Sequence, residues 1–278
     1  MFLIEILKAI AQGIVEGITE WLPVSSTGHI LLLDAFWPMM GGEEFFDVFK
    51  VIIQLGAILA VVVLYWGKLN PFSPKKTADE KKVTWVLWSK VLVASIPAAI
   101  AGLALDDLID GVLSTPVVIA AALILYGIAF ILMERRKSHH VRVETVEDIS
   151  YKHAFGIGAF QMLALIPGTS RSGSTILGAS LLGTSRTAAA EFSFFMAIPV
   201  MLGASGLKAV KYFLLDGYTF NLWQWILLLT ATAVAFVVSL LVIRGLMAFI
   251  QKHSFAPFGW YRIVLGAVVL GCVAMNWL

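Results

Sequence analysis

Six long apolar stretches restrict this chain to a membrane environment. Each has roughly the 20 residues that a helix needs to cross the hydrocarbon core of a bilayer. They are Val48–Trp66, Trp85–Leu105, Val112–Met133, Ala188–Leu207, Leu222–Ile243 and Phe258–Trp277. Only 14% of the 278 residues are charged, whereas a typical soluble domain has about 25%. The sequence therefore predicts an all-α integral membrane protein that crosses the bilayer several times.

Two further apolar stretches are each interrupted by a short, serine-rich polar break. The first stretch, Phe2–Met40, is broken at Pro23–Gly28, and the second, His153–Leu182, is broken at Pro167–Gly173. The pieces beside the second break are too short to span a bilayer comfortably. We therefore expect re-entrant helical hairpins, whose irregular backbone must be buried in protein or line a wet cavity.

The basic residues predict how the chain is oriented. Gly67–Val83 contains five lysines, and Glu134–Lys152 contains five lysines and arginines. Two apolar stretches separate these loops, so both lie on one side, which the positive-inside rule makes cytoplasmic. Arg244, Lys252 and Arg262 are expected to mark a third cytoplasmic turn. The first hairpin then opens outward and the second opens inward.

The two halves of the chain resemble each other. The pattern Phe46–Ala57 is similar to Phe192–Ala204, and each follows a polar break at a similar distance. One hairpin and three spans give an odd number of crossings, so the second copy must be inverted. We expect one polytopic domain over residues 1–278, with repeats at about 1–133 and 153–278 and a cytoplasmic loop at about 134–152. Inverted repeats with broken helices place a polar site near the membrane midplane.

Three polar residues precede the first break at helical spacing. Gln12, Glu16 and Glu20 recur every four residues, which places them on one helix face. Ionisable side chains at membrane depth usually face a bundle interior or a water-filled cavity. The alternative is a helix near the interface with solvated carboxylates. The polar break beside these residues favours a functional role.

The first break resembles the start of a helix. Ser25 and Ser26 are typical N-cap residues, which predicts that the helix containing Ile30–Phe36 begins near them. Its unpaired amides and its dipole would form an anion site. The alternative is capping without any ligand. A lone buried histidine is commonly structural, but His29 lies beside two hydroxyls and after two carboxylates, which favours function.

The second break repeats this pattern and adds an arginine. The hydroxyls that could cap a helix beginning near Gly173 belong to Thr169, Ser170 and Ser172. Arg171 lies between serines in apolar sequence and needs an anionic partner, and a phosphate matches its planar donors. The alternative is a structural salt bridge to Glu16 or Glu20. Both interpretations can be correct if the salt bridge breaks when substrate or metal binds.

The combined residue set favours a phosphorylated ligand. Carboxylates, an arginine and capped helix ends suit a phosphate together with Mg²⁺ or Ca²⁺, which prefer oxygen ligands. Glu16 and Glu20 are the candidate metal ligands. The apolar surroundings suit a lipid tail, and the net charge of +2 gives no indication of a nucleic-acid partner.

These motifs resemble those of a known family. The segment Glu16–His29 closely resembles the glutamate-rich motif of the bacterial undecaprenyl-diphosphatase family, also called the bacitracin-resistance family. Pro167–Gly173 is similar to the second motif of that family, and Phe46–Gly56 and Glu191–Pro199 are further similar blocks. The resemblance covers nearly the whole chain. It implies a bacterial inner-membrane enzyme, with an outward-facing site, that removes one phosphate from undecaprenyl pyrophosphate. The resemblance further implies that the product is the carrier lipid for peptidoglycan and that loss of the pyrophosphate would lower sensitivity to bacitracin.

For this reaction we assign hypothetical roles to the site residues. Ser26 is the expected nucleophile, His29 or Glu20 could act as base, and Arg171 would clamp the phosphate. The alternatives for the nucleophile are His29 and a metal-bound water. Further phosphate contacts are expected from Ser25, Thr27, Gly28, Thr169, Ser170, Ser172 and Gly173, with a lesser one from Gln54.

Two questions stay open at the level of sequence. The architecture alone also fits a transporter or flippase for an anionic lipid, because inverted repeats with half-helix sites are typical of transporters. The oligomeric state is open between a monomer and a homodimer.

Overall fold

Long helices form the frame of the protein. The computed structural model describes residues 2–108, 113, 115–135 and 141–278. Within these residues, six helices are long and apolar enough to cross a membrane. They are α3 (Glu43–Leu64), α5 (Ala78–Leu108), α6 (Pro116–Arg135), α9 (Arg186–Val210), α10 (Leu222–Ile250) and α11 (Ala256–Ala274). All six predicted stretches are thus confirmed as helices. Val112, the predicted start of the third, lies outside the described residues, as do Arg136 and Lys137 of the predicted cytoplasmic loop.

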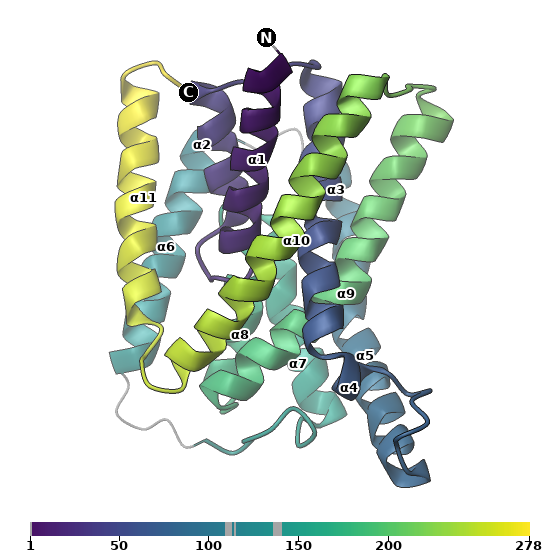
Figure 1. Cartoon of the computed structure of the whole chain (residues 1–278). Coiled ribbons are helices and arrows are strands. Elements are labelled where there is room, and N and C mark those ends of the chain that lie inside the picture. Colours follow the sequence, from purple (N-terminus) through teal and green to yellow (C-terminus); the bar gives the residue numbers. More distant parts are fainter. Residues whose placement is uncertain (1, 109–112, 114, 136–140) are drawn as a thin grey trace.

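Both interrupted stretches form helical hairpins. The first consists of α1 (Phe2–Thr19) and α2 (Ser26–Phe36). The second consists of α7 (Tyr151–Gln161), the 3₁₀ turn η2 (Met162–Leu165) and α8 (Arg171–Leu181). In Figure 1, α1 and α2 lie in the upper half of the molecule and α7 and α8 in the lower half, so the hairpins enter from opposite ends. Two short elements, α4 (Trp66–Leu69) and the π-helical turn η3 (Lys211–Leu215), follow α3 and α9.

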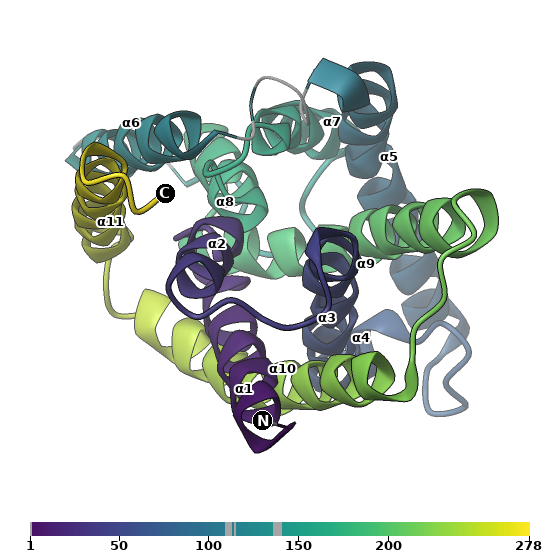
Figure 2. The same cartoon turned by 90° about the horizontal axis from the view of Figure 1, so that it is seen from above.

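Each hairpin packs against a long helix from the other half of the chain. Helix α1 lies along α10, and α7 lies along α5, as Figure 2 shows from above. Glycines permit this close approach, because a Cβ on Gly13 would lie 2.5 Å from the carbonyl oxygen of Ala231. Gly158 likewise faces the carbonyl of Ala94. Small residues at such contacts are typical of helix packing in membranes.

The outward faces of the helices are apolar. Large side chains on them are more than half exposed, among them Leu59, Val63, Leu103, Leu125, Leu229 and Leu241. A soluble monomer rarely exposes so much apolar surface. Lipid would cover these faces, and the protein is a multi-pass membrane protein.

The contact at Gly13 provides a test of the packing of the first hairpin. We expect Gly13→Ala to destabilise the protein by about 1–3 kcal/mol, because the new methyl group overlaps the backbone of α10. The measurement is thermal unfolding of the purified protein in detergent. Gly203→Ala on α9 is the matched control, since no atom of the described residues lies within 4 Å of a Cβ there. An unchanged unfolding temperature in Gly13→Ala would contradict the close α1–α10 contact.

Candidate functional site

The two polar breaks end in the same local structure. Ser25 precedes α2 with φ 74° and Ser170 precedes α8 with φ 71°, a left-handed conformation that is uncommon for serine. Each hydroxyl accepts a hydrogen bond from the amide three residues later, Gly28 at 3.4 Å and Gly173 at 3.1 Å. The predicted start of α2 is confirmed. Helix α8 begins at Arg171 rather than near Gly173, because Ser170 is the cap.

Side chains from elsewhere hold the two breaks together. The Ser172 hydroxyl donates to the carbonyl oxygens of Glu20 and Leu22, at 3.0 and 3.2 Å. The first turn of α8 therefore lies directly against the backbone of the first break. The unpaired amides that begin α2 and α8 are thus gathered in one region.

Arg262 fixes this junction from α11. Its side chain is fully buried and donates to the carbonyl oxygen of Pro23 at 3.0 Å and to those of Gly168 and Thr169 at 2.9 Å. One guanidinium thus contacts both breaks. The prediction that Arg262 marks a cytoplasmic turn is wrong. Its position inside the apolar stretch Phe258–Trp277 was the available signal, because a charge inside such a stretch usually faces the interior.

Two polar residues of α1, and the glutamate that directly follows this helix, are buried as a group. Gln12, Glu16 and Glu20 are 1%, 0% and 5% exposed, so the alternative of solvated carboxylates is wrong. One Glu20 oxygen accepts from Arg171 Nη2 at 2.9 Å, and the other accepts from the Ser26 hydroxyl at 2.7 Å. Glu20 therefore joins the candidate nucleophile of one break to the arginine of the other.

Arg171 has partners in two segments, the connection between α1 and α2 and helix α9. Its Nη2 pairs with Glu20, its Nη1 donates to the carbonyl oxygen of Ser193 on α9 at 2.7 Å, and its guanidinium lies 5.7 Å from the ring of Trp21. The predicted salt bridge to Glu20 is confirmed. The buried Nε has no hydrogen-bond partner among the described residues, so one donor stays free for a ligand.

Glu16 lacks a partner although it is fully buried. Within the described residues, neither of its oxygens nor Oε1 of Gln12 has a hydrogen-bond partner. Glu16 lies close enough to Glu20 and Arg171 to interact with both electrostatically. Burying an unpaired polar or charged group is costly. A positively charged ligand at Glu16 would remove that cost.

The donor set fits a hard divalent cation only in part. In the part of the chain that the structure describes, no group of three or more His, Cys, Asp or Glu side chains could hold a metal. The oxygen ligands available for a metal are the carboxylates of Glu16 and Glu20 and the side-chain amide oxygen of Gln12. Mg²⁺ is commonly held by one or two carboxylates together with substrate phosphates. The residues thus fit a cation that binds with its substrate.

His29 contacts Tyr261, a residue that the sequence analysis did not identify. Its Nδ1 lies 2.7 Å from the carbonyl oxygen of Ser25, and its Nε2 lies 2.6 Å from the hydroxyl of Tyr261. Because a carbonyl only accepts, Nδ1 carries a proton, and in the neutral ring Nε2 accepts from the Tyr261 hydroxyl. Neither contact reaches Ser26, whose partner is Glu20. The geometry thus favours Glu20 over His29 as the base for Ser26.

Several side chains that were predicted to bind phosphate donate hydrogen bonds to backbone carbonyl oxygens instead. The Thr169 hydroxyl donates to the carbonyl oxygens of Leu163 and Ile166, and Ser172 holds the first break. Thr27 is exposed, and Gln54 is half-buried on α3. The structure brings together Glu16, Glu20, Ser26 and Arg171. Sequence reasoning missed Ser193, Tyr261 and the bridging role of Arg262.

The helices and the site define a class of protein: a multi-pass membrane protein with a buried, ion-paired site where two broken helices meet. The chain belongs to the family of bacitracin resistance protein BacA, whose model matches residues 9–268. It is 54% identical over 272 residues to an undecaprenyl-diphosphatase of Enterococcus faecalis, covering 98% of each chain. It is 56% identical over 270 residues to an undecaprenyl-diphosphatase of Streptococcus thermophilus, covering 97% of this chain and 93% of that protein. A third undecaprenyl-diphosphatase, from Streptococcus agalactiae, is 52% identical, and the match covers 97% of each chain.

Proposed function

We propose that this protein hydrolyses undecaprenyl diphosphate to undecaprenyl phosphate and inorganic phosphate. The relatives that carry the name of this activity match the chain over nearly its whole length. The observation that carries the proposal is the chain of contacts from Ser26 through Glu20 to Arg171. A hydroxyl nucleophile and an arginine, each hydrogen-bonded to the same carboxylate base, are groups that phosphoryl transfer needs. The product would return the lipid carrier to peptidoglycan synthesis, and removal of the diphosphate would confer resistance to bacitracin.

The proposed chemistry begins at the Ser26 hydroxyl. Its oxygen attacks the terminal phosphorus while Glu20, 2.7 Å away, takes its proton. The bond from that phosphorus to the bridging oxygen breaks, and the lipid monophosphate leaves with the electron pair. Water then hydrolyses the phosphoserine, which releases inorganic phosphate and restores the hydroxyl. His29 or a water molecule in place of Ser26 would be the competing nucleophile.

The charge that develops on the phosphoryl oxygens would be stabilised by groups already in place. Arg171 offers its free Nε. The first-turn amides of α2 and α8 lie at the positive ends of the two helix dipoles, where the two polar breaks meet. Such preorganised donors are commonly the largest catalytic contribution. Ser25, Gly28, Ser170 and Gly173 serve by shaping the two helix starts.

A divalent cation is part of the proposal. Glu16 and Glu20 would hold Mg²⁺ or Ca²⁺ together with phosphate oxygens, and the unpaired oxygens of Glu16 support this. The cation, when bound, would neutralise charge on the diphosphate. Glu16 then has a partner only when the substrate site is loaded.

The proposal places the site on the outer side of a bacterial inner membrane. Two features support inverted repeats as its framework: the matching left-handed serine caps, and the packing of each hairpin on a long helix of the other half. In Figure 1 the described parts of the basic segments 67–83 and 134–152 lie at the end opposite the chain termini. With that end cytoplasmic, the first hairpin opens outward.

A transporter or flippase for an anionic lipid is the second candidate. The arrangement of two hairpins entering from opposite ends favours it, because broken helices that meet near the midplane are typical of transporters. An enzyme releases phosphate in detergent without any gradient, and a transporter does not.

One assay tests the reaction and the cation together. We expect the purified protein in detergent to release inorganic phosphate from undecaprenyl diphosphate, and a chelator to lower the rate at least about tenfold, because the diphosphate charge is then unneutralised. Added Mg²⁺ or Ca²⁺ should restore the rate. Lipid movement across vesicles without phosphate release would support the transporter instead, and full activity in the chelator would exclude the cation.

A further inference from the structure

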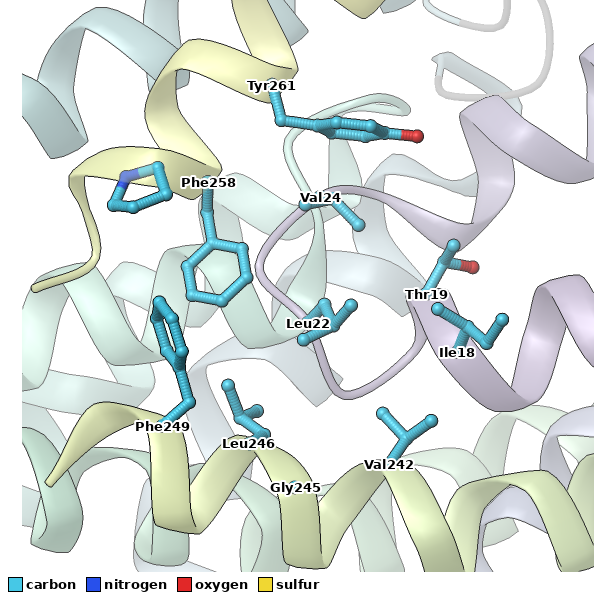
Figure 3. A pocket seen from close by; sticks show the side chains of 11 residues that line it. Ile18, Thr19, Leu22, Val24, Val242, Gly245, Leu246, Phe249, Phe258 and Tyr261 are labelled. Carbon is cyan, nitrogen blue, oxygen red and sulfur yellow. The ribbon is translucent and has the colours of Figure 1, made fainter. Parts of the chain in front are cut away.

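A cavity of about 570 Å³ lies directly beside the first break. Figure 3 shows its walls: Leu22 and Val24 of the break, Val242 and Leu246 of α10, Phe249 near the end of α10, and Phe258 at the start of α11. Its volume is within the range of about 300–1,000 Å³ that is typical of small-molecule sites. This space is separate from the cluster of Glu16, Glu20, Ser26 and Arg171.

The cavity is suited to an apolar ligand. The lining residues with a hydroxyl are Thr19 and Tyr261. The Thr19 hydroxyl already donates to the carbonyl oxygen of Val15 at 2.7 Å, and that of Tyr261 contacts His29 at 2.6 Å. Among the described residues, no charged side chain lines the cavity. A hydrocarbon would fill it without leaving a polar group unpaired.

The cavity and the polar site share a wall. Leu22 lines the cavity with its side chain, and its carbonyl oxygen accepts from Ser172 of the second break. Val24 lines the cavity and directly precedes the cap Ser25. Tyr261 lines it and bonds to His29. A single ligand can therefore place a polar head at Ser26 and an apolar chain in the cavity.

The cavity borders the part of the surface that faces lipid. It is partly open to the outside, and residues of α10 and α11 form much of its wall. On these helices, Leu241 and Val264 are 67% and 62% exposed. A hydrocarbon chain in the cavity would continue into the bilayer without crossing water.

Gly245 keeps the cavity open on the side of α10. A Cβ at this position would meet no atom within 4 Å, and the residue lines the cavity. Glycine inside a helix costs roughly 0.5–1 kcal/mol relative to alanine. Here the absence of a side chain leaves space that no described residue fills.

We propose that this cavity binds the isoprenoid units next to the diphosphate of the lipid substrate, which reach it between α10 and α11. The inference rests on the proposed function, because it takes the head group to lie at Ser26. In Figure 1 the end of α10 and the start of α11 lie toward the end of the molecule away from the termini. A lipid whose head group faces outward would thus extend its chain inward, past the first break.

Binding of a non-hydrolysable analogue tests this assignment on the full-length protein. The probes are farnesyl methylenediphosphonate and the same diphosphonate without a farnesyl chain. We expect Gly245→Leu to raise the Kd of the farnesyl probe about tenfold or more, because filling the cavity removes burial of apolar surface. The Kd of the chain-free probe should not change. Gly271→Leu on α11 is the matched control, since a Cβ there also meets nothing within 4 Å and the residue does not line the cavity, and it should change neither Kd.

Two results would overturn the proposal: an unchanged Kd of the farnesyl probe in Gly245→Leu, or an equal rise for both probes. Photocrosslinking of the wild-type protein by a benzophenone-bearing farnesyl diphosphonate gives a second readout that needs no variant. Adducts within residues 18–24 or 242–261 support the cavity, and adducts confined to other segments, as expected if membrane phospholipid fills it, refute it. Phosphate release by the wild-type protein is measured in parallel. If release fails while the binding pattern holds, the proposed reaction is wrong and the cavity assignment stands.

Discussion

Replacing Ser26 by alanine is expected to lower kcat by about 10³-fold or more, as the loss of a covalent nucleophile does in other enzymes. The Ser26 hydroxyl donates to Glu20 at 2.7 Å, and the residue occupies the first position of α2. The base and the helix dipole thus act on the same oxygen. Binding of the diphosphonate probe should change little, because the serine contributes mainly in the transition state.

Ser205→Ala is the control for the loss of a buried hydroxyl. Ser205 is 3% exposed and donates to the carbonyl oxygen of Val51 at 3.1 Å, away from the site. It should retain normal turnover. Acid quenching of the wild-type reaction should also trap an acid-stable phosphoserine. Near-normal activity of Ser26→Ala would exclude the serine route, and an acid-labile phosphoenzyme would indicate His29 as the nucleophile.

The helices were predictable because a membrane imposes simple rules. Every backbone group must be paired inside the bilayer, so a long apolar stretch becomes a helix. The ends of the helices depended on local caps, and these were predicted only in part. Ser25 matched the expectation for the first break, whereas Ser170 moved the start of α8 forward to Arg171. Two or three hydroxyls in a row can each cap, and the sequence does not order them.

The composition of the site was predictable, but its connections were not. Spacing along one helix placed Glu16 and Glu20 together, and burial confirmed it. The contact between Arg171 and Glu20 joins residues 151 positions apart, and the sequence offered it only as one of two partners. Its selection depends on how α8 meets the first break. Ser172 determines this contact, because its hydroxyl donates a hydrogen bond to the backbone of the first break and not to a ligand.

Residues that act from another helix were the hardest to foresee. Tyr261 is an ordinary membrane-helix tyrosine until the fold places it against His29. The position of Arg262 inside an apolar stretch indicated a buried role. The positive-inside rule led to another interpretation, because it counts any arginine near the end of such a stretch. Its full burial and its carbonyl partners in both breaks show that it fixes the two breaks relative to each other.

Removal of the Arg171 side chain is expected to lower kcat/KM by about 10³-fold or more, the range found for arginines that stabilise a transferring phosphoryl group. Arg171→Lys should rescue little, because a lysine cannot contact Glu20 and Ser193 and still direct a donor at phosphate. Stability should fall as well. Breaking a buried ion pair leaves Glu20 uncompensated, which costs about 3–5 kcal/mol in other proteins.

A double variant separates the two roles of this arginine. In Arg171→Ala with Glu20→Gln the uncompensated charge is gone, so thermal stability in detergent should recover toward that of the wild-type protein. Phosphate release should stay lost, since the clamp and the base are both missing. Binding of the chain-free diphosphonate reports on the clamp alone, and we expect its Kd to rise in Arg171→Ala and to stay high in the double variant. If the double variant regained the wild-type Kd, Arg171 would serve only to neutralise Glu20, and the phosphate would be held by the helix amides alone.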